Sequence, residues 1–134
     1  MELYNFSNSN IYFSCEKVGK FLAKCGVDRR EALRIKLTFE EVLLEYQAKF
    51  GEKAIFKVRL LKRLSSIKVE IIVEGESYNA LVKNSDEGDV IQGLLAGIGL
   101  APTWNYKNGK NYIILVVFVA PCRCKTGASQ KSIY

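Results

Sequence analysis

Apolar residues recur every three or four positions between Asp28 and Phe50, which predicts a long helix with one apolar stripe. Asp28 and Glu31 have the spacing of a capping box at its start, and Gly51 marks its end. We expect the stripe to cover a β-sheet. Its members are Ile35, Phe39, Val42, Leu43, Tyr46 and Phe50.

Five other segments have the apolar and polar patterns of strands. They are residues 3–6, 54–61, 67–73, 103–106 and 111–119. Asn108-Gly109 is a strong hairpin signal between the last two. The last segment is apolar on both faces, so we expect it to lie inside the sheet.

Two further helices are expected, from about Asn10 to Cys25 and from Asp89 to about Leu100. The order of elements predicts an α/β (α+β) two-layer sandwich, with about three helices on one face of a mixed sheet. One domain should span residues 1–120. The polar residues 121–134 are expected to form a disordered tail.

Composition narrows the chemistry of this 134-residue chain. Since it has no histidine, it has no Ser-His or Cys-His catalysis and no imidazole metal ligands. The four cysteines lack the spacing of a metal site, and we expect free thiols in the cytoplasm. The longest apolar run, residues 112–120, is far below the roughly 20 residues of a membrane span.

Glu41 and Glu45 lie one turn apart on the long helix. Residues 34–46 resemble the N-box helix of histidine-kinase-like (GHKL, Bergerat-fold) ATPases, in which an asparagine follows a glutamate four residues later. The resemblance implies that Glu41 orients or activates the water that attacks ATP. It also implies that Glu45, in place of the asparagine, ligates Mg²⁺. The alternative is an ordinary solvated helix face.

The adenine-binding box of that family, D-x-G-x-G, is altered here. It follows a strand, and Glu74 takes the place of its aspartate, followed by Gly75. Glu76 and Tyr78 then stand where the glycines of the box belong. The implied cofactor-binding residues are therefore Glu74 and Gly75.

Gly97 and Gly99 have the letters of the family's second, phosphate-gripping glycine box. Such a box must open a helix, so that free backbone N–H groups face the phosphates. These glycines instead close an apolar segment shortly before Pro102, which favours a helix C-cap and turn. The stretch between Tyr78 and Val90 is also too short for the family's ATP lid.

The resemblance spans about residues 3–120 in order of elements. The chain is similar to the lid-less domain at the N-terminus of some bacterial cation:dicarboxylate symporters, and more distantly to anti-sigma-factor kinases. The shared motifs include the turn at residues 75–79 and the hairpin at residues 106–111. The resemblance implies a regulatory module without ATP hydrolysis. Such a module would bind a protein partner, which includes a membrane transporter, or form a homodimer. A functional domain that binds ATP and Mg²⁺ is the alternative.

The net charge of +6 offers a rival interpretation. Six basic residues concentrate on one expected hairpin: Lys53, Lys57, Arg59, Lys62, Arg63 and Lys68. We rank first a solvated sheet face on which Lys57 or Arg59 pairs with Glu70. An anionic membrane surface ranks second. Nucleic acid ranks third, because Trp104 and the other aromatic residues do not interleave with the patch.

The long helix carries a second apolar row, Leu33, Leu37 and Leu44, on the side away from the stripe. The first helix is the expected cover, because neighbouring helices in a layer usually touch. The alternative is a homodimer or a partner helix on this row.

Overall fold

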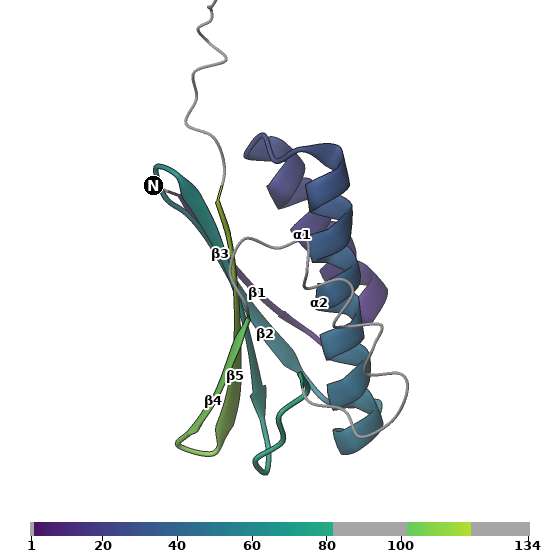
Figure 1. Cartoon of the computed structure of the whole chain (residues 1–134). Coiled ribbons are helices and arrows are strands. Elements are labelled where there is room, and N and C mark those ends of the chain that lie inside the picture. The colour runs from purple at the N-terminus through teal and green to yellow at the C-terminus, as the bar shows by residue number, and fades with distance from the viewer. Residues whose placement is uncertain (1, 82–101, 119–134) are drawn as a thin grey trace, which may run out of the picture.

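Two helices cover one face of a five-stranded sheet in the computed structural model of the chain, which describes residues 2–81 and 102–118 (Figure 1). The elements in chain order are β1 (Glu2–Asn8), α1 (Ile11–Lys24), α2 (Arg29–Phe50), β2 (Phe56–Lys62), β3 (Ser66–Glu74), β4 (Thr103–Lys107) and β5 (Lys110–Phe118). The strands lie in the order β1-β2-β3-β5-β4.

The two-layer α+β class is therefore confirmed, with one correction to the expected details. All four strand pairings are antiparallel, whereas a mixed sheet was expected. The described residues hold two helices where about three were expected, because the segment 89–100 lies outside them. Gly97, Gly99 and the expected tail at 121–134 also lie outside the described residues.

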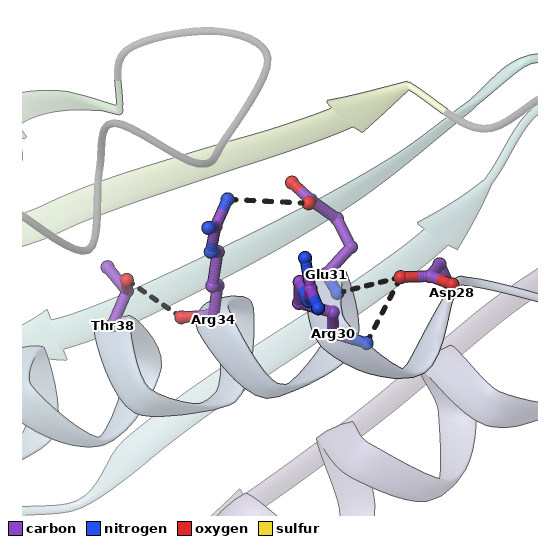
Figure 2. Close-up of polar contacts among 5 residues, drawn as sticks. All are labelled: Asp28, Arg30, Glu31, Arg34 and Thr38. Carbon is purple, nitrogen blue, oxygen red and sulfur yellow. Dashed lines mark hydrogen bonds and ion pairs between the residues drawn. The ribbon is translucent and has the colours of Figure 1, made fainter.

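Side-chain caps set the starts of both helices. The side chain of Asn10 accepts a hydrogen bond from the backbone N–H of Phe13 at 2.8 Å. Asp28 accepts from the N–H groups of Arg30 and Glu31 at 3.1 and 3.4 Å (Figure 2). This confirms the capping role of Asp28. The side chain of Glu31 lies 4.0 Å from Arg34, so the reciprocal half of the capping box is replaced by a contact within the helix.

The hairpin between β4 and β5 turns where the sequence predicts. Asn108 and Gly109 have φ angles of 53° and 75°. Positive φ at both central residues is the geometry of a type I′ turn, which asparagine and glycine tolerate best. β5 lies between β3 and β4, which confirms that it is an internal strand.

The core lies between the helices and the inner face of the sheet. The predicted stripe of α2 is buried at every position except Phe50, which is half-buried. The strand residues that face it alternate with outward-facing ones, as a half-buried sheet requires. The buried strand residues include Phe56, Val58, Leu60, Ile67, Val69, Ile71, Val73, Ile113, Leu115 and Val117.

The second apolar row of α2 is not covered by α1, contrary to expectation. Leu33, Leu37 and Leu44 remain 55%, 38% and 41% exposed. The buried apolar side chains of α1, including Val18 and Leu22, belong to the core cluster. Because α1 uses its apolar side for the core, it lies beside the row and leaves it at the surface.

Candidate functional site

Glu45 lies on the second turn of α2 from its C-terminal end and is half-buried. The hydroxyl of Tyr78 donates a hydrogen bond to its Oε1 at 2.9 Å. Glu41, one turn earlier, is also half-buried. The implied Mg²⁺ ligand is therefore already engaged by a side chain from the segment that follows β3.

Glu74 ends β3 and is exposed. It has the same strand parity as Glu70 and Ile72, and these residues point away from the helix layer. Glu74 lines a surface groove of about 470 Å³ together with Lys53 and Lys57. The structure thus does not bring Glu74 together with Glu41 and Glu45.

Gly75 occupies a tight position next to α2. Its φ is +148°, and a Cβ at this residue would lie 3.0 Å from the ring of Phe50. Its N–H donates to the carbonyl of Gly109 at 3.0 Å, and its carbonyl accepts from the hydroxyl of Tyr106 at 2.8 Å. Glycine is needed here for both backbone conformation and space. The N–H and the carbonyl of Gly75 are thus both hydrogen-bonded within the protein.

Asn111 ties this segment to the sheet, and sequence reasoning missed it. Its side chain is fully buried near the start of β5. Oδ1 accepts from the N–H of Tyr78 at 2.9 Å and from the indole N–H of Trp104 at 3.1 Å. Nδ2 donates to the carbonyls of Val73 at 3.3 Å and Glu76 at 2.9 Å. Two signals were available: Asn111 ends the hairpin motif at residues 106–111, and it is a polar residue at an inward-facing position of an otherwise apolar strand.

Three aromatic rings join α2 to the segment after β3. Tyr46 stacks on Phe50 with ring centres 5.9 Å apart, and it meets Tyr78 edge-on at the same distance. The hydroxyl of Tyr46 donates to the carbonyl of Tyr78 at 2.8 Å, and burial raises the pKa of Tyr46. Lys49 lies over the Tyr78 ring at 5.3 Å and 3.8 Å from Glu76. We call Tyr46, Phe50, Tyr78 and Asn111 the closed cluster.

A second feature lies on the solvent side of the helix layer. A groove of about 550 Å³ runs between α1 and α2, and its apolar lining includes Tyr12, Leu33, Leu37 and Leu44. Lys36 and Glu16 face each other across it at 3.8 Å. Tyr12 is 75% exposed. We call this the helix groove.

One cation of the basic hairpin pairs across the strands. Arg59 and Glu70 are register partners on β2 and β3, and Arg59 Nη1 lies 3.0 Å from Glu70 Oε1. Glu70 is only 7% exposed, so this pair is partly shielded from water. The predicted cross-strand pairing is confirmed for Arg59.

Within residues 2–81 and 102–118, no three His, Cys, Asp or Glu side chains gather closely enough to hold a metal ion. In the same ranges, no helix has the length and apolar character needed to cross a membrane. The sequence matches no protein-family model and no curated protein.

Proposed function

We propose that this chain is a degenerate histidine-kinase-like (GHKL) domain that acts through protein contacts and does not hydrolyse ATP. The observation that carries the proposal is the closed cluster, which occupies the place where the resemblance puts an adenine box. There the segment after β3 is bonded to α2, β5 and the β4–β5 turn by its own side chains and backbone.

Opening this region for a nucleotide would be costly. Glu45 would have to lose the Tyr78 hydroxyl before it could ligate Mg²⁺. Phe50 would have to leave Gly75 before a base could approach that backbone. Each buried polar group left unpaired costs about 1–3 kcal/mol, so binding would have to offset several such losses. This cost supports a domain that no longer uses ATP.

The same proposal includes a reducing compartment, namely the cytoplasm. Cys15 is a buried free thiol. Free thiols are typical of cytosolic proteins, whereas oxidising compartments favour disulfides. The partner of the domain is then a cytoplasmic protein surface, and a membrane transporter is one such partner.

Calorimetry with ATP and Mg²⁺ tests the proposal on the full chain. We expect no binding in the micromolar range for the wild-type protein or for Glu45→Ala. Glu52→Ala is the matched control, because Glu52 is an exposed carboxylate just beyond α2. Micromolar binding that Glu45→Ala abolishes and Glu52→Ala preserves would refute the proposal and make Glu45 a metal ligand.

A further inference from the structure

The apolar row of α2 is exposed at the helix groove. We propose that a second copy of this chain docks on the groove, with the two α2 helices antiparallel about a two-fold axis. The inference deepens the proposed function by naming the partner of a protein-interaction domain. It rests on the spacing of the row and on the distribution of charge along α2.

The spacing of the row suits a helix–helix seam. Leu33, Leu37 and Leu44 are separated by four and seven residues, which are the d, a and a positions of a heptad. Ile35 and Val42 occupy the opposite side of the helix and are fully buried in the core. α2 thus has two apolar sides, and the described structure covers one of them.

Charge is segregated along α2. Its N-terminal half carries four basic residues and one acidic residue, whereas the half after Phe39 carries three acidic residues and one basic residue, Lys49. The basic residues are Arg29, Arg30, Arg34 and Lys36; the carboxylates are Glu40, Glu41 and Glu45. The helix dipole favours the reverse arrangement, with acidic groups near the N-terminus. Stability of the isolated helix therefore does not explain the pattern.

An antiparallel second copy does explain it. Each basic half then faces the acidic half of the other α2, whereas a parallel pair would place like charges together. Arg34 and Glu41 both occupy heptad position e, and e positions face each other in an antiparallel pair. Two-fold symmetry makes this contact twice, as an isologous interface requires. The side chain of Arg34 is 45% exposed, and its contact with Glu31 is long, at 4.0 Å. Arg34 therefore remains able to pair with a carboxylate of a second copy.

α1 completes the surface. Tyr12 adds an exposed ring to the part of the groove that Leu44 lines. The Lys36–Glu16 pair bridges the two helices at 3.8 Å and neutralises one charge of the basic half. The groove therefore combines exposed leucine and tyrosine side chains with a bridging ion pair, and such a mixture of apolar and charged groups is typical of a protein–protein interface.

Sedimentation equilibrium of the full chain measures the dimer directly. We expect a dimer at micromolar concentration that weakens as salt is added. Leu37→Glu places two like charges in the seam and should weaken the dimer at least about tenfold, with circular dichroism unchanged. Leu64→Glu is the control, because Leu64 is 88% exposed in the β2–β3 turn. A wild-type chain that stays monomeric at high micromolar concentration overturns the proposal.

Charge exchange tests the antiparallel arrangement even if Leu37→Glu fails to fold. Arg34→Glu and Glu41→Arg should each weaken self-association, because each places like charges at both symmetric contacts. An equimolar mixture of the two variants restores opposite charges and should dimerise as tightly as the wild type. If the mixture associates no better than the single variants, the antiparallel pairing is wrong. Neither result depends on ATP, so this test can fail while the calorimetric one succeeds.

Discussion

The two sides of α2 differ in how far their side chains are covered and bonded by the rest of the protein. Towards the sheet, the closed cluster satisfies its polar atoms with protein partners: Asn111 alone makes four hydrogen bonds. Towards solvent, the helix groove leaves three leucines at least 38% exposed, and the Lys36–Glu16 ion pair that bridges α1 and α2 is 3.8 Å long. On the proposal made above, the residues that resemble a nucleotide site hold the fold together, and the surface that binds a partner lies on the other side of the helix.

Replacing Asn111 should remove the hydrogen bonds of the closed cluster, and we expect the largest loss of stability from this change. Asn111→Ala leaves two N–H donors and two carbonyls without their partner in a buried site. We expect the free energy of unfolding to fall by about 3 kcal/mol or more, measured by urea denaturation. Asn105→Ala is the control, because Asn105 is exposed on the same hairpin.

A fall of less than about 1 kcal/mol for Asn111→Ala would place it among ordinary surface substitutions. In that case the four hydrogen bonds would contribute little, and the segment after β3 would not be held closed by them.

Alkaline pH should destabilise the side of α2 that carries the helix groove, because the buried thiol of Cys15 lines this groove. Cys15 is 5% exposed, and burial, followed by the charge of Glu40, raises its pKa from 9.0 to about 11. Since the pKa is higher in the folded state, the contribution of Cys15 to stability is complete below pH 9. It is lost as the pH rises towards 11, by about 2–3 kcal/mol in total.

The measurement is the free energy of unfolding at several pH values for the wild type and for Cys15→Ala. The variant should lose less stability than the wild type between pH 9 and pH 11, because it lacks the thiol. Tyrosines such as Tyr46 titrate in both proteins and cancel in the comparison. Equal pH dependence in the two proteins would show that the thiol is not shielded from water.

Local patterns predicted most of the fold. The cap at Asp28, the end of α2 at Gly51 and the Asn108-Gly109 turn depend on neighbours in the chain, and the periodicities of 3.6 and 2 assign the buried faces. The antiparallel sheet was missed because the mixed sheet was inferred from the order of elements, and that order does not fix which strands pair or in which direction.

The site was harder to predict, because its contacts join distant residues. Asn111 bonds to Tyr78, 33 positions earlier, and Tyr78 reaches Glu45, another 33 positions earlier. No local pattern carries that information. The cover of Leu37 was also mispredicted, since α1 had enough apolar side chains for either the core or the row, and only the three-dimensional packing decides between them.

Amide hydrogen exchange on the full chain tests the contrast between the two sides in one measurement. Residues 74–81 should exchange slowly and at the same rate with and without ATP and Mg²⁺, because their bonds are already made within the protein. Residues 33–44 should exchange more slowly as protein concentration rises, because a second copy covers the helix groove. Slower exchange of residues 41–45 and 74–81 on adding ATP, with no effect of concentration on residues 33–44, would contradict the account.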